Sequence, residues 1–286
     1  MRIAIIGAGN MGGAIARALV KCPSLKEAQI ICTTRTQSSL DRLRERTPNM
    51  QFTLDNCAAV ASADIVLLAV KPWLMQDVVE QIRPALNLEQ QIIISVAAGI
   101  SLDDMAQMLH SDKATIFRLI PNTAIEVMCS MTFFCSRNAT EQQEQIITQI
   151  FNEAGCAMAV EESKIEAGTA LASCGIAFAM RYIRAAAEAG VELGFRAAEA
   201  HKIVEYTVKG AAELLLHNGN HPEAEIDKVT TAGGITIKGI FFFLKYAQND
   251  TPEQREKNKK KLAEARKRAA EKYGETYEEV TDEDLK

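Results

Sequence analysis

The chain has 286 residues, of which 48% are hydrophobic and 24% charged, the balance of a soluble globular protein with two domains or one large one. Its formal net charge of −5 argues against nucleic acid or an anionic membrane as the main partner. The seven cysteines are scattered and form no C-x-x-C pair. We therefore expect no metal site and no disulfide framework, but reduced thiols in a cytoplasmic protein. Arg17 and several glycines interrupt the apolar N-terminus, which argues against a signal peptide or a membrane span.

The first half of the chain alternates short β-branched runs with amphipathic stretches. The runs predict strands at Arg2–Ile6, Gln29–Thr33, Ile65–Val70, Ile92–Ala97 and Thr115–Leu119. The stretches between them predict helices at Met11–Lys21, Ser38–Arg46, Leu74–Ala85 and Leu102–His110. Continuously apolar runs indicate strands buried on both faces, as in a parallel sheet. The order predicts an α/β fold with a doubly wound, Rossmann-type parallel sheet.

The second half is predicted to be helical. A further strand at Met131–Cys135 and a helix at Glu141–Ala154 come before Val160, after which strand signals stop. Long Ala-rich helices are predicted at Ser163–Glu192 and Arg196–Leu216. A long helix so rich in small residues needs a close partner to bury its face, which favours dimerisation.

These patterns predict three parts. Residues 1–159 form the Rossmann domain, residues 160–248 an all-helical dimerisation and substrate domain, and residues 249–286 a charged tail. The tail contains the basic run Lys257–Lys261, but interleaved acidic residues favour a solvated helix or spacer over a nucleic-acid-binding tail.

The segment Gly7-Ala8-Gly9-Asn10-Met11-Gly12 fits G-x-G-x-x-G directly after a predicted strand and at the start of a helix. Gly7 permits the tight turn, and Gly9 lets the backbone approach a diphosphate. Gly12, backed by Gly13, allows close helix packing. The alternative is a glycine turn without a ligand, which the position within a βαβ unit disfavours. Gly7, Gly9, Asn10, Met11 and Gly12 are therefore predicted to bind a dinucleotide at a helix N-terminus.

The end of the second strand predicts which coenzyme binds. NAD sites usually place a carboxylate there for the ribose 2′-hydroxyl. This chain has Thr34 and Arg35 instead, and a guanidinium suits a 2′-phosphate. NADP(H) is therefore predicted over NAD(H), with Arg35 as the main determinant. The alternative for Arg35 is a solvated loop charge.

Two later strand ends point to the same edge of the sheet, where ligands bind in such folds. Val70-Lys71-Pro72 closes one strand, and Asn122 follows another. Lys71 and Asn122 are predicted to approach the nicotinamide ribose or amide. Alternatively, the prolines only end the strands and their neighbours cap turns.

A hydroxyl-rich segment, Lys228–Ile237, precedes a further predicted helix. The backbone at Gly233 and Gly234 can converge on an anion, and Thr231 adds a donor. A carboxylate substrate would suit this segment. An ordinary capped helix start is the alternative.

This segment resembles the signature of pyrroline-5-carboxylate reductases, usually D-K-V-T-S-P-G-G-T-T. The similarity spans roughly residues 1–240 and includes G-x-G-N-M-G at 7–12, A-V-K-P at 69–72 and P-N-T at 121–123. It also includes Glu166–Gly175, which is similar to the family's D-A-V-T-A-L-S-G-S-G. Several motifs in the right order are more specific than any one of them.

The resemblance implies a Rossmann domain followed by a helical domain that interlocks with a second subunit, as a homodimer or a ring of dimers. It also implies NAD(P)H-dependent reduction of 1-pyrroline-5-carboxylate, a carboxylate imine, to L-proline in proline biosynthesis. The family's roles carry over to Thr236, which would hydrogen-bond the ring nitrogen. Thr231, in place of the family's serine, and the Gly233-Gly234 backbone would hold the carboxylate.

This chain departs from the family pattern at several positions. Ala232 replaces a proline, Ile235 a small or hydroxylated residue, and Ile176 the proline of a Gly-Pro-Ala run. After Ile240 the chain continues with Phe241–Leu244 and the charged tail instead of the family's last helix, so the tail is either appended or a replacement.

The chemistry expected from this pattern is mainly positioning. None of the four histidines lies in a motif suited to proton transfer, and a protonated imine chiefly needs hydride at the right distance. A rival interpretation is a β-hydroxyacid dehydrogenase, but Ala172–Met180 lacks the lysine which that class places on its long helix. A second rival is a non-catalytic NADP-binding protein.

Overall fold

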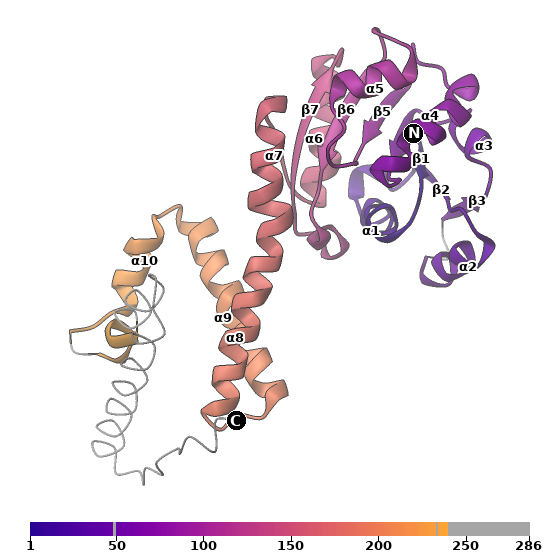
Figure 1. Cartoon of the computed structure of the whole chain (residues 1–286). Coiled ribbons are helices and arrows are strands. Elements are labelled where there is room, and N and C mark those ends of the chain that lie inside the picture. Colours follow the sequence, from indigo (N-terminus) through magenta and orange to yellow (C-terminus); the bar gives the residue numbers. More distant parts are fainter. Residues whose placement is uncertain (48–49, 233, 240–286) are drawn as a thin grey trace. The chain divides into compact units, whose positions relative to one another are not determined.

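A computed structural model describes residues 1–47, 50–232 and 234–239 (Figure 1). The chain divides into two compact units, Met1–Glu192 and Leu193–Lys286, which are described separately. The long helix that begins the predicted helical domain is grouped with the sheet in the first unit. The division at Val160 stays a prediction based on where strand signals end.

The first unit is built on one eight-stranded sheet, ordered β3-β2-β1-β4-β5-β6-β7-β8. Pairing is parallel throughout, except between β6 and β7, which are antiparallel. The strands are β1 Arg2–Ile6, β2 Gln29–Thr33, β3 Gln51–Thr53, β4 Ile65–Leu68, β5 Ile92–Ser95, β6 Thr115–Ile120, β7 Ser130–Arg137 and β8 Gly155–Ala159. The predicted doubly wound α/β fold is confirmed.

Besides the helical stretch 235–239, the described residues form ten α-helices. They are α1 Asn10–Leu19, α2 Gln37–Arg46, α3 Asn56–Val60, α4 Met75–Ile82, α5 Leu102–Leu109, α6 Glu141–Glu153, α7 Ile165–Gly168, α8 Gly175–Glu192, α9 Ala197–Asn218 and α10 Pro222–Val229. Short 3-10 turns are η1 Pro23–Leu25, η2 Pro72–Leu74, η3 Arg83–Ala85, η4 Thr123–Val127 and η5 Glu162–Lys164, and a π-helical turn, η6, covers Thr169–Cys174.

The structure corrects several predicted boundaries. β4 ends at Leu68 and β5 at Ser95, each two residues earlier than predicted. The helix predicted over Leu74–Ala85 is the shorter α4 between two 3-10 turns, because Pro72 and Pro84 each open such a turn. The helix predicted over Ser163–Glu192 is continuous but contains the π turn.

The core consists of two apolar layers, one on each face of the sheet, because successive strand side chains point to opposite faces. Ile3 and Ile5 of β1 belong to one layer, whereas Ala4 and Ile6 belong to the other. Helices α1 and α6 cover the first layer, and α4 and α5 cover the second (Figure 1). Each fully buried Ile or Leu contributes roughly 1.5–3 kcal/mol. The parallel strands are therefore held firmly, and their carboxyl ends share one edge.

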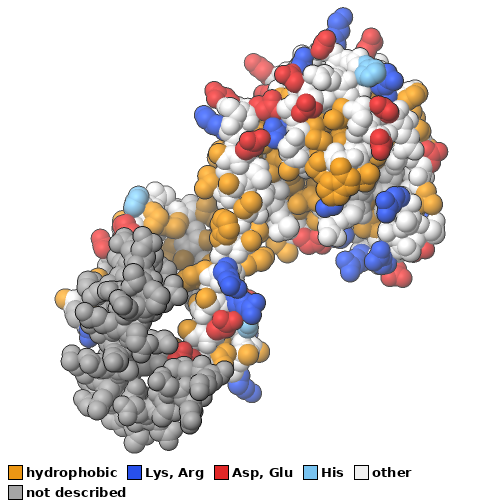
Figure 2. Space-filling view, viewed as in Figure 1, with side chains coloured by type: hydrophobic (Ala, Val, Ile, Leu, Met, Phe, Trp, Pro, Cys, Tyr) orange, Lys and Arg blue, Asp and Glu red, His pale blue; other side chains and the backbone are white. Residues whose placement is uncertain are grey.

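The long helices bury little of their own apolar surface in the single chain. Within the described residues, α8 buries only Ala187 and α9 only Ala200. Large apolar side chains stay exposed, including Phe178 at 69% and Tyr206 at 67%. Figure 2 shows such side chains at the surface of the helical segments. No described helix is long and apolar enough to cross a membrane.

Candidate coenzyme and substrate sites

A glycine turn joins β1 to α1 and lies between two strand ends. Gly7 has φ +88°, a left-handed conformation that favours glycine. Its N–H donates to Thr33 Oγ1 of β2 at 3.3 Å. A Cβ on Gly7 would lie 2.6 Å from Val70 Cγ1, in the segment that follows β4. The turn thus requires glycine both for its conformation and for the space that Val70 fills.

The next two glycines differ in their surroundings. A Cβ on Gly12 would lie 2.5 Å from Gly7 O and 2.8 Å from Ala69 Cβ, so this glycine allows α1 to pack tightly against the turn. Around Gly9, in contrast, no described atom lies within 4 Å of a Cβ position. Gly9 caps α1 without a side-chain hydrogen bond, and the first turn of α1 carries no acidic residue. The open space and the uncapped helix N-terminus are what the predicted diphosphate site requires.

Asn10 and Met11 occupy the first turn of α1. Asn10 is exposed beside the anion site, whereas Met11 is half-buried and packs against the core. Only Asn10 therefore presents its side chain to a ligand. Met11 can offer only its backbone to the predicted site.

The end of β2 presents the cationic group predicted for a 2′-phosphate. Thr34 is buried and its hydroxyl donates to Thr36 O at 3.1 Å, so it shapes the turn. Arg35 is exposed, and among the described residues no hydrogen bond or ion pair engages it. Arg42, which the sequence analysis missed, folds back from α2 to Ser38 O at 3.4 Å and Ser39 Oγ at 3.3 Å. The sequence feature that could have indicated this contact is the i, i+4 spacing of Ser38 and Arg42 on one helix.

Lys71 and Pro72 lie just after β4 at the same edge. Pro72 opens the turn η2, but β4 has already ended at Leu68, so Pro72 does not itself end the strand. Lys71 is exposed, and its Nζ lies 5.9 Å from the ring centre of Trp73. Trp73 is itself 75% exposed. This leaves an ammonium and an indole at the mouth of the predicted coenzyme site.

Asn122 is 7% exposed and begins the turn η4. Its Oδ1 accepts from Ala124 N at 3.0 Å, and its own N–H donates to Ser130 Oγ at 3.1 Å. The capping role considered for this residue is therefore present. The side-chain oxygen is already used, which leaves the amide nitrogen as the group that can contact a ligand.

Glu126 and Arg17 connect this turn to α1. Arg17 Nε and Nη2 donate to the two carboxylate oxygens of Glu126 at 2.6 and 2.5 Å. The hydrogen bond from Arg17 holds the pKa of Glu126 below its ordinary value. No sequence pattern indicated this pair, because the two residues are 109 positions apart.

The predicted substrate segment lies in the second unit. α10 ends at Val229, Gly234 N donates to Thr231 O at 2.9 Å, and residues 235–239 are helical. Thr231 and Thr236 are exposed, and Thr236 stands in the first turn of the new helix. Gly233 lies outside the described residues. The segment is thus a turn that leads into a helix N-terminus with two free hydroxyls nearby.

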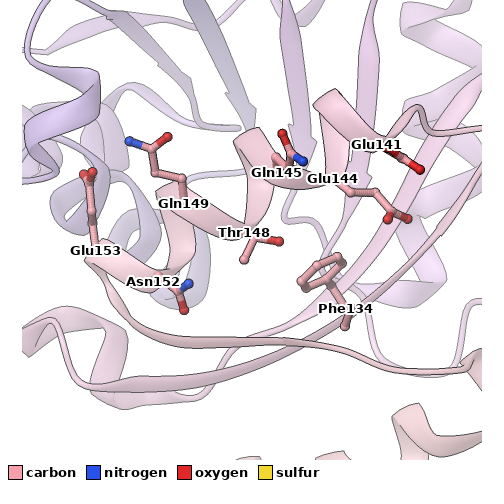
Figure 3. A pocket seen from close by; sticks show the side chains of 9 residues that line it. Phe134, Glu141, Glu144, Gln145, Thr148, Gln149, Asn152 and Glu153 are labelled. Atoms are coloured by element: carbon pink, nitrogen blue, oxygen red, sulfur yellow. The ribbon is translucent and has the colours of Figure 1, made fainter.

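An open groove of about 680 Å³ runs along α6 (Figure 3). It is lined mainly by polar residues of that helix, and none of the predicted site residues belongs to it. Two of its carboxylates already have partners: Glu144 accepts from Ser136 Oγ, and Glu153 accepts from Ser24. The groove therefore has no arrangement suited to the predicted chemistry. Among the described residues, no group of three or more His, Cys, Asp or Glu side chains could hold a metal ion.

Comparison with protein families matches both halves of the chain. Residues 162–272 match the family described as pyrroline-5-carboxylate reductase dimerisation. Residues 2–99 match the family described as NADP oxidoreductase coenzyme F420-dependent. The two matches cover the helical segments and the glycine-turn segment respectively.

Two similar curated proteins come from Dictyostelium discoideum. Pyrroline-5-carboxylate reductase 1 is 40% identical over 250 residues, and pyrroline-5-carboxylate reductase 2 is 38% identical over 252. Each match covers 83% of this chain, with 45% of the first protein and 84% of the second. This chain therefore spans about half the length of the first relative and most of the second.

Solved structures show the same fold. The pyrroline-5-carboxylate reductase from Coxiella burnetii gives a TM-score of 0.77 at 29% identity, covering 94% of this chain and 97% of that one. The Plasmodium falciparum pyrroline carboxylate reductase with NADP bound gives 0.75 at 22% identity, covering 86% and 90%.

Proposed function

The chain belongs to the pyrroline-5-carboxylate reductase family, and we propose on that basis that it reduces 1-pyrroline-5-carboxylate to L-proline with NADPH. The observation that carries the proposal is the open space beside Gly9 at the uncapped N-terminus of α1, in a chain that also exposes Thr231 and Thr236 around the start of a later helix. The 38% identical relative that this chain matches over most of its length bears the name of this activity.

The glycine turn and the end of β2 would hold the coenzyme. The backbone at Gly7, Gly9 and Gly12 leaves room for the diphosphate at the N-terminus of α1. Arg35, exposed and unengaged among the described residues, would pair with the 2′-phosphate. NADP(H) is the preferred coenzyme, and NAD(H) is the weaker alternative. When bound, the reduced coenzyme supplies the hydride.

The segment 231–236 would hold the substrate. Thr231 and the backbone at Gly233 and Gly234 would bind the carboxylate, and Thr236 would orient the ring nitrogen. The imine is already protonated, so the hydride adds to the ring carbon and the nitrogen keeps its proton as the C=N bond becomes single. The protein therefore needs to supply distance and orientation rather than an acid.

The proposed active form is a homodimer or a ring of dimers in the cytoplasm. Support comes from the dimerisation family match at residues 162–272 and from the apolar side chains that the single chain leaves exposed. Leu171 and Leu216, for example, are 78% and 82% exposed. Such surface is normally covered by another subunit.

Oxidation of NADPH by the purified full chain, with and without 1-pyrroline-5-carboxylate, tests the activity. We expect substrate-dependent turnover, faster with NADPH than with NADH. Thr236→Ala should lower kcat by about tenfold or more, since one oriented hydrogen bond is lost. Thr236→Ser keeps the hydroxyl and is the matched control. NADPH binding without turnover in the wild type would favour a non-catalytic protein, and an unchanged rate in Thr236→Ala would refute the role of Thr236.

A further inference from the structure

The turn η4, which begins directly after Asn122, is tied to the helix that starts at the glycine turn. Arg17, on α1, makes two hydrogen bonds to the Glu126 carboxylate, at 2.6 and 2.5 Å. Lys21, in the turn that follows α1, reaches Glu126 O at 3.4 Å. The side chain of Glu126 is therefore held by α1, and its backbone by the turn that follows α1.

The geometry of this ion pair is specific. The Arg17 side chain is only 17% exposed, and the planar guanidinium meets both carboxylate oxygens, which fixes orientation as well as distance. A Cβ on Gly13 would lie 3.2 Å from Arg17 Nη1. Gly13 therefore makes room for the guanidinium, in addition to the helix packing expected of it from the sequence.

The position of this turn sets the position of Asn122. Asn122 Oδ1 accepts from Ala124 N within the same turn, so the amide moves with η4. From the other side, Ser173 Oγ in the π turn donates to Pro121 O at 3.2 Å. Asn122, which is predicted to face the nicotinamide, is thus held from two sides. One contact comes from α1 through η4, and the other comes from the π turn η6.

We infer that Arg17 and Glu126 are positioning residues, which fix Asn122 relative to the glycine turn so that the nicotinamide end of the coenzyme is held for hydride transfer. The adenosine end, held at Arg35 and the glycine turn, does not depend on the pair. This inference rests on the proposed coenzyme and on the predicted role of Asn122.

Steady-state kinetics and binding of the full chain test the inference with Arg17→Gln, Glu126→Gln and the double variant. We expect kcat to fall about three- to thirtyfold, because small displacements of a positioning group are costly to hydride transfer. Affinity for NADPH should fall severalfold, while affinity for 2′,5′-ADP, which lacks the nicotinamide half, should stay unchanged. The double variant should be no worse than either single variant, because both act through one contact.

Arg137→Gln is the matched control. Arg137 also bridges two carboxylates, those of Asp103 and Asp112. It lies on β7 beside Ile116, near the start of β6, whereas Asn122 follows the end of β6. The control residue is therefore at the opposite edge of the sheet from Asn122. We expect it to leave kcat and both affinities unchanged.

Two results would overturn the inference. One is a Glu126→Gln protein that melts earlier but keeps its kcat and NADPH affinity, because the pair would then be structural only. The other is additive loss in the double variant. If the wild type fails to reduce the imine, the proposed function fails, but the comparison of NADPH with 2′,5′-ADP still decides whether the pair positions the nicotinamide end.

Discussion

Gly9 and Gly12 should respond in opposite ways to the same substitution, although they are three residues apart in one motif. In Gly12→Ala the new methyl group would lie 2.5 Å from Gly7 O and 2.8 Å from Ala69 Cβ. Both are far inside van der Waals contact, and one is a backbone atom, so the turn or α1 must move. In Gly9→Ala the methyl group meets no described atom within 4 Å.

The expected magnitudes follow from these surroundings. Overpacking of a tight contact costs about 1–3 kcal/mol, which corresponds to a fall in Tm of about 3–10 °C for a unit of this size. Gly9→Ala should change the free energy of unfolding by no more than about 1 kcal/mol, since the methyl group is unhindered at a helix cap. That methyl group occupies the space of the diphosphate, however, so the Kd for NADPH should rise at least about tenfold, or 1.4 kcal/mol.

Thermal melts without coenzyme and NADPH titrations separate the two effects. Gly12→Ala should melt early, whereas Gly9→Ala should melt near the wild type and bind NADPH poorly. The reasoning fails if Gly9→Ala binds NADPH with wild-type affinity, because the open space beside Gly9 would then not be the diphosphate site. It also fails if the two variants have the same Tm.

Three further results are expected. Arg35→Asp should raise the KM for NADPH while that for NADH stays similar or falls, and an unchanged KM for NADPH would remove Arg35 as the determinant. The hydrogen bond from Arg17 lowers the pKa of Glu126. Its stabilisation should therefore be complete above the ordinary pKa of 4.5 and disappear as the pH falls through the lowered value. Urea unfolding of wild type and Glu126→Gln should thus differ, by at most about 1 kcal/mol for this partly exposed pair, near neutral pH but not in strong acid. Burial raises the pKa of Cys32 to about 12, so a thiol reagent at mildly alkaline pH should modify the exposed Cys129 and Cys156 and reach Cys32 only after unfolding.

The sequence predicted the sheet wherever strands are long and apolar. β1 and β2 have the predicted ends, because β-branched runs bounded by turns leave little ambiguity. β3 was missed because its three residues, Gln51–Thr53, are only partly buried. β8 was missed because Gly155–Ala159 has small and mixed residues without alternation. Its pairing with β7 is a tertiary effect, which periodicity does not encode.

Strand ends near the site were predicted too late. β4 stops at Leu68 although Ala69 and Val70 are apolar. The side chain of Val70 instead fills the space beside Gly7. Hydropathy cannot distinguish an apolar residue with this role from one buried within a strand. The π turn within the long helix was missed for a related reason, since the sequence there is compatible with an ordinary helix.

Among the predicted site residues, the glycines are those whose role depends on the backbone. Gly7 is recognisable because its conformation requires glycine. The Arg17–Glu126 pair was missed because it depends on which distant segments the fold brings together, whereas the contacts of Arg42 with Ser38 and Ser39 are local and were overlooked. The substrate segment was predicted from its hydroxyls and paired glycines, the role of Thr236 came from the resemblance to a family, and the placement of Thr236 relative to the coenzyme remains a prediction.

Trp73 has a practical consequence for all of these measurements. It is the chain's single tryptophan, and its ring stands in solvent beside Lys71, in the segment that follows the strand next to the glycine turn. All indole emission of the protein thus originates beside the predicted coenzyme site. A reduced nicotinamide absorbs where tryptophan emits, so quenching of this one emission would report binding at the predicted site without any label.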